Sequence, residues 1–163
     1  FYAFAIGLAF AILTVALIAK PELLGDLREA AQARYGVSTL RNVDVEAALA
    51  RLESRMTEAK VYRDENLSLE TLAELVGLSG HQLSELINSR LGMGFSRYVR
   101  ERRIEAAKEL LLKAPGQSVL SVGLETGFRS QSSFYVAFKE ATGQSPGDFR
   151  RSRGRAAGVQ ALE

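Results

Sequence analysis

The hydrophobic positions divide this chain into one uniformly apolar segment and a longer region of amphipathic helices. Residues 1–19 contain no charged side chain, and Lys20 and Pro21 follow them directly. From Asp44 onward, apolar residues recur three and four positions apart, which is the spacing that places them on one face of a helix. The pattern therefore predicts an all-α chain that begins with an apolar segment.

Residues 1–19 are predicted to form one transmembrane helix. At 1.5 Å per residue they make a helix of ~28 Å, close to the ~30 Å thickness of a bilayer's hydrocarbon core. A signal peptide would carry a basic region and a cleavage site, and a buried core helix is rarely apolar on every side. Because Lys20, Arg28 and Arg34 follow the segment, the positive-inside rule places residues 20–163 in the cytoplasm, against the inner membrane.

Two features suggest that more chain precedes this segment. The sequence begins at Phe1 rather than at Met, which indicates a piece of a longer protein. Ala3, Gly7 and Ala11 recur every four residues, a pattern of small residues that permits close helix packing. We expect this face to pack against upstream membrane helices, and a dimer interface is the alternative.

A connector and a linker helix are predicted between the apolar segment and the rest of the chain. Residues 20–43 are mixed and mildly polar, as a juxtamembrane connector would be. Within residues 44–66, a helix begins after Asp44, which is a good N-cap, and runs to about Arg63. Its apolar stripe is expected to pack on the following domain, and a short coiled coil is the alternative.

The remainder of the chain repeats itself at a spacing of about 50 residues. Apolar or small residues at i, i+3, i+4 and i+7 from Leu69 form one face of a two-turn helix, and the same pattern starts again at Val119. An internal repeat of this kind means that one supersecondary unit occurs twice. The two copies are residues 68–92 and residues 118–143.

Each copy has the pattern of a helix-turn-helix. The first helix ends at Gly77 or Gly127, where a residue without a Cβ most easily adopts the left-handed conformation that ends a helix. A second helix follows, capped by Ser79 in the first copy and by Ser130 in the second. Two helices of about eight and twelve residues joined by a turn with glycine are typical of this motif.

The exposed side of each second helix carries hydrogen-bonding side chains. Such side chains read base edges in a major groove, where Gln and Asn pair with adenine and Ser adapts to several bases. A solvated polar face is the alternative, but contact with DNA is favoured on the outer side of these helices. The candidates for base contact are His81, Gln82, Ser84, Glu85, Asn88, Gln131, Ser132, Ser133 and Tyr135.

Residues 95–112 are predicted to form one amphipathic helix between the two copies. This connecting helix would be ~27 Å long, which is enough to hold two recognition helices about one turn of B-DNA, ~34 Å, apart. One chain could then enter two successive major grooves.

Basic residues on the connecting helix and around the second copy are candidates for phosphate contacts. Such contacts position a protein on DNA without reading its sequence. The candidates are Arg97, Arg100, Arg102, Arg103, Arg129, Ser130, Lys139, Arg150 and Arg151. Residues 152–163 are predicted to be a basic, disordered tail.

Composition narrows the possible functions. The chain has no cysteine and one histidine, which excludes disulfide frameworks, cysteine-ligated metal sites and thiol nucleophiles. We therefore expect no metal, no cofactor and no enzymatic activity. Residues 20–91 hold 9 Lys and Arg against 12 Asp and Glu, a net −3, whereas residues 92–163 hold 12 against 7, a net +5. The basic half calls for an acidic partner, such as double-stranded DNA.

The motifs of the second copy resemble those of AraC/XylS-type transcriptional regulators. The resemblance covers residues 68–151 and is carried by residues 127–134, Gly-Phe-Arg-Ser-Gln-Ser-Ser-Phe, together with Arg103, Ile104, Ala107, Leu110, Leu111, Phe138, Lys139, Thr142, Gly143, Ser145, Pro146, Phe149 and Arg150. It implies a seven-helix domain that activates or represses transcription, with RNA polymerase as a partner and a homodimer as a possibility.

A narrower resemblance points to a membrane-anchored branch of the same family. It is carried by Arg34, Tyr35, Met56, Tyr62 and residues 67–69. Two positions depart from the family, because many members have arginine where Glu85 and Val136 stand. An acidic side chain at Glu85 repels phosphate but accepts a hydrogen bond from cytosine.

The function that we expect is a membrane-tethered, sequence-specific DNA-binding regulator. The alternative is a protein-interaction module, in which the same helices dock a transcription partner without reading DNA. AraC-type domains also occur fused to alkyl-transferring DNA repair modules, but those need a nucleophilic cysteine, which this chain lacks.

Overall fold

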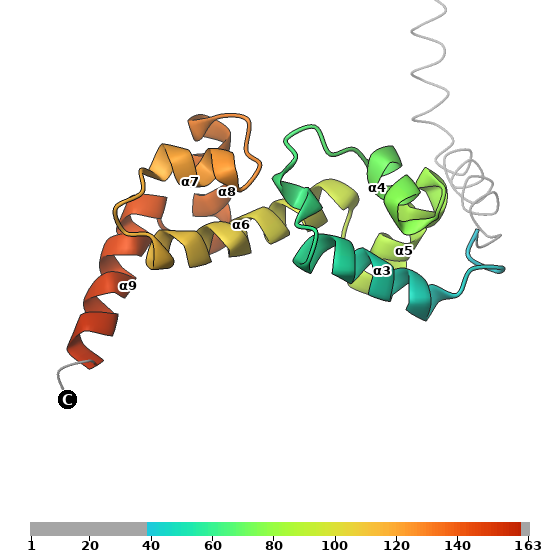
Figure 1. The fold of residues 1–163 in the computed structure, drawn as a ribbon, viewed down its shortest axis with the longest axis horizontal. Coiled ribbons are helices and arrows are strands. Elements are labelled where there is room, and N and C mark those ends of the chain that lie inside the picture. Colours follow the sequence, from blue (N-terminus) through green and yellow to red (C-terminus); the bar gives the residue numbers. More distant parts are fainter. Residues whose placement is uncertain (1–38, 161–163) are drawn as a thin grey trace, which may run out of the picture. The chain divides into compact units, whose positions relative to one another are not determined.

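The computed structural model describes residues 39–160 (Figure 1). The described residues form seven α-helices and one 3-10 helix, with no strand among them. The elements are α3 (Val45–Thr57), η1 (Val61–Arg63), α4 (Leu69–Val76), α5 (Gly80–Leu91), α6 (Phe95–Lys113), α7 (Val119–Glu125), α8 (Gln131–Thr142) and α9 (Pro146–Gln160). The all-α prediction is confirmed for this part of the chain.

Side-chain caps set the starts of α3, α5 and α8, as the sequence predicted. The Asp44 carboxylate accepts a hydrogen bond from the backbone N–H of Ala47 at the start of α3. At α5, Ser79 and Gln82 form a reciprocal capping box, which satisfies two backbone N–H groups that have no partner within the helix. Ser130 caps α8 as Asp44 caps α3, by accepting a hydrogen bond from the backbone N–H of Ser133.

The linker helix is shorter than its sequence pattern predicted. We expected it to run to about Arg63, but α3 ends at Thr57 and Val61–Arg63 is a separate 3-10 turn. Lys60 adopts a left-handed conformation, with φ of 51°. The Tyr62 side chain, two residues later, is buried, and helical periodicity does not predict this tertiary contact.

Two separate hydrophobic cores lie within the described residues. The first core joins α3, η1, α4 and α5, and the second joins α7, α8 and the start of α9. The helix α6 contributes to both, because Tyr98 and Val99 belong to the first core whereas Ile104, Ala107 and Leu111 belong to the second. This helix therefore connects the α4–α5 unit to the α7–α8 unit, as the predicted connecting helix was expected to do (Figure 1).

The end of the described chain differs from the sequence prediction. We expected a disordered tail over residues 152–163, but α9 continues through residues 152–160. The helix starts at Pro146, a residue whose fixed φ suits the first helical position. Once a helix has started, each further residue is added at little cost, so a basic composition alone does not argue against a helix.

The predicted transmembrane helix, residues 1–19, lies outside the described residues, and so do residues 20–38 of the predicted connector. Across residues 39–160, no helix combines the length and the apolar character needed to cross a membrane.

Candidate nucleic-acid interface

The helices α5 and α8 each bury one side and expose the other. Leu83, Leu86 and Ile87 point into the first core from α5. Phe134 and Phe138 point into the second core from α8, where their rings meet edge to face at 5.5 Å between centroids. Because these apolar residues are locked in the cores, the polar residues between them face away from the protein.

Most of the predicted base-contact residues lie on these outward faces. His81 and Asn88 of α5 are exposed, as are Gln131 and Ser132 of α8. Ser84, Glu85 and Tyr135 are partly exposed, at intermediate positions on the same faces.

Three of the predicted base-contact residues have structural roles. Gln82 accepts a hydrogen bond from the backbone N–H of Ser79 at 2.9 Å as part of the capping box. The Ser133 hydroxyl donates to the carbonyl of Ser130 at 2.9 Å, within the first turn of α8. Tyr135 packs against the second core and meets the Phe134 ring edge to face, at 6.2 Å between centroids.

Aligning the two outward faces identifies a residue that the candidate list missed. With an offset of 51 residues, Ser132 is equivalent to His81, Val136 to Glu85, and Lys139 to Asn88. The Val136 side chain is 59% exposed, which is unusual for a large apolar residue in the middle of a polar face. An apolar side chain at such a position can contact the methyl group of thymine. Its spacing of four residues from Ser132 was the signal that could have found it.

Arg97 and Arg100 on α6 are held only by exposed ion pairs. Arg97 pairs with Glu101 at 2.7 Å, and Arg100 pairs with Glu140 of α8 at 3.5 Å. Exposed pairs of this kind contribute about 0–1 kcal/mol. Both arginines can therefore exchange their carboxylate partner for a phosphate at little cost.

Arg102 is held more firmly than Arg97 and Arg100. Its guanidinium forms a bidentate ion pair with Glu53 of α3 and lies over the Tyr98 ring at 5.3 Å. Burial alone would lower the pKa of Arg102, but the attraction of Tyr98 and Glu53 outweighs burial, and the pKa is raised. This arginine joins α3 to α6.

Three further arginines that the sequence suggested as phosphate contacts are directed at backbone carbonyls. Arg103 donates to the carbonyl oxygens of Tyr62 and Asp64 at 2.7 and 2.8 Å. Arg129 donates from Nε to the carbonyl of Glu65 at 3.1 Å. Arg150 donates to the carbonyl of Pro115 at 3.2 Å, and its Nε and Nη2 are buried without a hydrogen-bond partner among the described residues.

The junction of α8 and α9 gathers the remaining candidates for phosphate contact. A groove of about 490 Å³ lies there, lined by Lys139, Gly143, Gln144, Ser145, Asp148, Arg151 and Ser152. Arg151 is paired with Asp148. A hydrogen bond from Ser145 and the charge of Arg151 hold the pKa of Asp148 below its usual value. Ser130 lies at the other end of α8, where its side chain caps the helix.

No group of three or more His, Cys, Asp or Glu residues that could hold a metal ion occurs within residues 39–160.

Comparison with known proteins identifies what this arrangement resembles. Residues 72–152 match a family model described as a helix-turn-helix domain. An HTH-type transcriptional regulator of Staphylococcus aureus is 39% identical over 89 residues, which are 55% of this chain and 12% of that protein. The chain thus spans about an eighth of the length of this relative.

Two solved structures share the fold. One is a transcriptional regulator of the type that contains an AraC-type DNA-binding domain, from Chromobacterium violaceum. It is similar at 31% identity with a TM-score of 0.59, over 66% of this chain and 93% of that chain. The other is the DNA-binding domain of AdpA in complex with a target DNA, at 26% identity with a TM-score of 0.58, over 66% of this chain and 94% of that chain.

Proposed function

We propose that this chain, which belongs to the AraC-type helix-turn-helix transcriptional regulators, binds double-stranded DNA sequence-specifically by inserting α5 and α8 into two successive major grooves. The observation that carries the proposal is the repetition of one outward-facing set of positions on both helices. The AdpA domain was solved on a target DNA, which supports DNA as the partner. The relatives are transcriptional regulators, which are not enzymes.

The exposed side chains of the two helices divide into base-reading and phosphate-binding groups. His81, Ser84 and Asn88 would meet base edges from α5. Gln131, Ser132 and Val136 would do so from α8, with Glu85 and Tyr135 beside these two groups. Arg97, Arg100, Lys139 and Arg151 would supply the salt-dependent attraction to phosphates, and the α8 N-terminus, capped by Ser130, favours an anion through its backbone N–H groups.

A binding experiment on the full 163-residue chain tests this proposal. The chain would be kept in a mild detergent because residues 1–19 are apolar, and duplexes would be selected from a random library by repeated binding and amplification. Fluorescence anisotropy should then show tighter binding to the selected duplex than to a shuffled one of equal composition. Binding should weaken steeply between ~50 and 200 mM salt. Equal affinity for both duplexes at every salt concentration would contradict sequence-specific binding.

Contact with RNA polymerase is a further part of the proposal. The outer face of α7 exposes Leu120 and Leu124, at 43% and 49%, on the helix that precedes the recognition helix in the second unit. A double substitution of both leucines by serine should abolish activation in a transcription reaction while leaving DNA affinity within about twofold. A parallel loss of DNA binding would show that these leucines serve the DNA-binding fold instead.

Tethering to the inner membrane completes the proposal. Residues 1–19 would be the anchor, and residues 20–163 would lie on the cytoplasmic side. The tethering is supported by the uncharged residues 1–19 and by the basic residues Lys20, Arg28 and Arg34 that follow. The wild-type chain should remain with the membrane fraction after a carbonate wash, whereas a Leu8→Lys, Leu13→Lys variant should be released. Release of the wild-type chain by carbonate would contradict the anchor.

The same membranes test for a homodimer through the face formed by Ala3, Gly7 and Ala11. A dimer that uses this face would give a crosslinked species of twice the mass, and Gly7→Ile would remove it because close helix packing needs small residues. A crosslinked dimer that survives Gly7→Ile would place the dimer contact elsewhere.

A further inference from the structure

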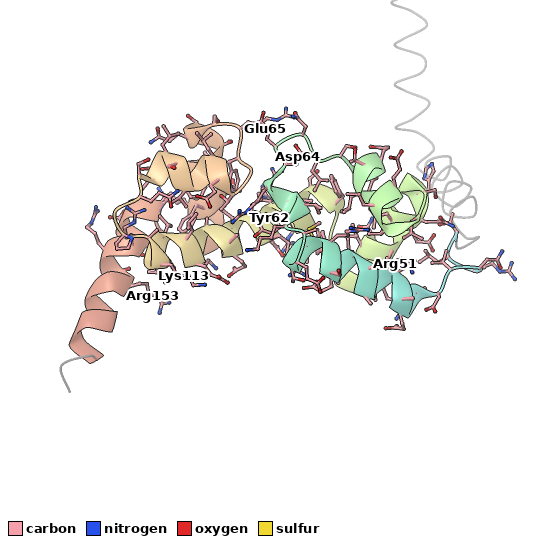
Figure 2. All side chains as sticks on the ribbon, viewed as in Figure 1. Arg51, Tyr62, Asp64, Glu65, Lys113 and Arg153 are labelled. Carbon is pink, nitrogen blue, oxygen red and sulfur yellow. The ribbon has the colours of Figure 1, made fainter. Side chains whose placement is uncertain are left out.

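The segment from Tyr62 to Asn66 belongs to the first half of the chain but lies against the turn of the second helix-turn-helix. Figure 2 labels Tyr62, Asp64 and Glu65 on this segment, which runs between the α4–α5 and α7–α8 units. Two arginines attach to it, Arg103 from α6 and Arg129 from the α7–α8 turn. We call these two arginines and their acceptors on residues 62–66 the clamp.

Without the clamp, the two hydrophobic cores would be joined through α6 and through one exposed ion pair, between Arg63 and Glu125 of α7 at 3.6 Å. Each core has its own set of buried residues, and α6 supplies residues to both. A single long helix between two bodies can curve gently, since its backbone hydrogen bonds on the solvent side lengthen slightly. A second connection, away from the helix axis, restricts that motion.

The clamp is built from well-formed hydrogen bonds to uncharged acceptors. Arg103 reaches the carbonyls of Tyr62 and Asp64, and its guanidinium lies over the Phe128 ring at 5.9 Å. Arg129 donates to the carbonyl of Glu65 and, at 2.9 Å, to the Asn66 side-chain oxygen. Both guanidinium groups thus hold the segment with two of their nitrogens.

Partial burial distinguishes Arg103 from an exposed arginine that is available to bind phosphate. Desolvation lowers the pKa of Arg103, and the neighbouring Asp64 only partly opposes this. Turning the side chain toward DNA would leave the partly buried Tyr62 carbonyl without this donor, and an acceptor that loses its partner costs free energy in proportion to its burial. Arg103 is therefore committed to the protein rather than to phosphate.

Gly127 allows the close approach on which the clamp depends. Its φ is +92°, and a Cβ placed there would lie 2.4 Å from the Tyr62 carbonyl oxygen and 2.9 Å from Nε of Arg103. Gly77, the equivalent glycine of the first unit, also has positive φ, but a Cβ on it would meet no described atom within 4 Å. The tight contact is thus particular to the second unit.

We propose that Arg103 and Arg129 are positioning residues that hold α5 and α8 at a fixed separation, so that the protein selects DNA by the spacing of its two half-sites. This inference rests on the proposed insertion of both helices into DNA. A protein whose recognition helices are held rigidly cannot follow a half-site that is moved by one base pair, which also rotates it about the duplex axis.

Spacing variants of the selected duplex test the inference. The wild-type chain should bind the original duplex at least about tenfold more tightly than duplexes with one base pair added or removed between the half-sites. Asn66→Ala and Arg129→Ala should lower this ratio to about threefold or less. An unchanged ratio in both variants would overturn the inference.

The salt dependence and a conservative substitution separate positioning from phosphate binding. If Arg129 positions α8, Arg129→Ala should leave the slope of log affinity against log salt unchanged. A slope lowered by about 1 would instead assign Arg129 to a phosphate and overturn the inference. Arg129→Lys should fail to restore the spacing ratio, because an ammonium cannot donate in the fixed fork of a guanidinium. Lys139→Ala is the matched control that should lower the slope while keeping the ratio.

A distance measurement tests the clamp without DNA. The chain has no cysteine, so spin labels would attach only to the two introduced ones, Asn88→Cys on α5 and Ser132→Cys on α8. Double electron–electron resonance should give one narrow distance distribution, which broadens when Asn66→Ala and Arg129→Lys are added. An unchanged distribution would overturn the clamp. If no duplex is selected but the distribution broadens, the proposed DNA binding fails while the clamp stands.

Discussion

The two helix-turn-helix units share one plan but differ in what surrounds their turns. Gly77 and Gly127 hold equivalent places, and both have positive φ. The turn at Gly77 faces open space, whereas the turn at Gly127 is pressed against the backbone of Tyr62 and Arg63. In the first unit, glycine is thus required only by the left-handed backbone of the turn. In the second unit, glycine is required both by that backbone and by the close approach of Tyr62 and Arg63.

The outer surfaces of the two units differ in chemistry as well. The first unit presents Glu70, Glu74 and Glu85, whereas the equivalent positions of the second unit are leucine, leucine and Val136. Carboxylates repel phosphates, so the second unit and α6 should supply most of the attraction to DNA. The first unit would then contribute more to selectivity than to affinity.

The largest expected difference between the units concerns their turn glycines. Gly127→Ala should destabilise the fold by about 3 kcal/mol, because the new Cβ is strained by positive φ and also collides with the Tyr62 carbonyl. Gly77→Ala should cost about 1–2 kcal/mol, from the left-handed backbone alone. Urea unfolding followed by circular dichroism measures both. Equal costs would show that the Gly127 turn relaxes freely, and would weaken the comparison.

The helix crossing gives the next largest effect. A Cβ on Gly123 would lie 2.7 Å from Cδ1 of Phe134, which is fully buried, so Gly123→Ala should cost about 2 kcal/mol through overpacking. Ala73 occupies the equivalent place in the first unit, and Ala73→Gly should cost about 1 kcal/mol by loosening the helix backbone. The same urea unfolding experiment measures the change in the free energy of unfolding for both variants. A stabilised Gly123→Ala variant would mean that Phe134 has room to move.

Lys139 and Asn88, equivalent residues on the two recognition helices, should differ in what they contribute to binding. Lys139→Ala should weaken binding to all duplexes by about 1 kcal/mol and lower the salt slope by about 1. Asn88→Ala should cost about 1–3 kcal/mol on the selected duplex alone, at an unchanged slope, because it loses a base contact. Titrations at several salt concentrations separate the two. A lowered slope for Asn88→Ala would contradict the division of roles.

The smallest expected effect concerns the exposed Val136. Val136→Ala should weaken binding by about 1 kcal/mol on the selected duplex, in proportion to the apolar surface lost. Replacing thymine by deoxyuridine, which lacks the methyl group, should weaken the wild-type chain equally and leave the variant unaffected. Glu85→Gln, at the equivalent place on α5, should instead strengthen binding to every duplex. Additive losses for Val136→Ala and deoxyuridine would exclude a methyl contact.

Much of the fold could be predicted because its determinants are local. The caps at Asp44, Ser79 and Ser130 act on backbone groups three residues away, and helical periodicity spans four. The repeat then reinforced each pattern by showing it twice. The candidate site was predicted in part, since the outward faces of α5 and α8 follow from which residues of those helices are apolar.

The roles of individual site residues were harder to predict. Gln82 and Ser133 lie on the outward faces, yet their side chains are used by helix caps. Val136 was noted as a departure from the family but was not predicted to contact a base, because an apolar residue is ordinarily counted with the core. Exposure depends on what the rest of the chain covers, and periodicity within one helix does not contain that information.

Most of the helices, their caps, the repeat and the basic character of the second half could be predicted from the amino-acid sequence, because each depends on neighbours in the chain or on composition. The roles of Arg103 and Arg129 could not be predicted in this way, because it is the folded chain that brings them to the carbonyls of residues 62–66. Their partners lie between 39 and 64 residues away. An arginine has the same charge in either role, so only the position of distant carbonyls in the folded chain distinguishes a phosphate ligand from a structural clamp.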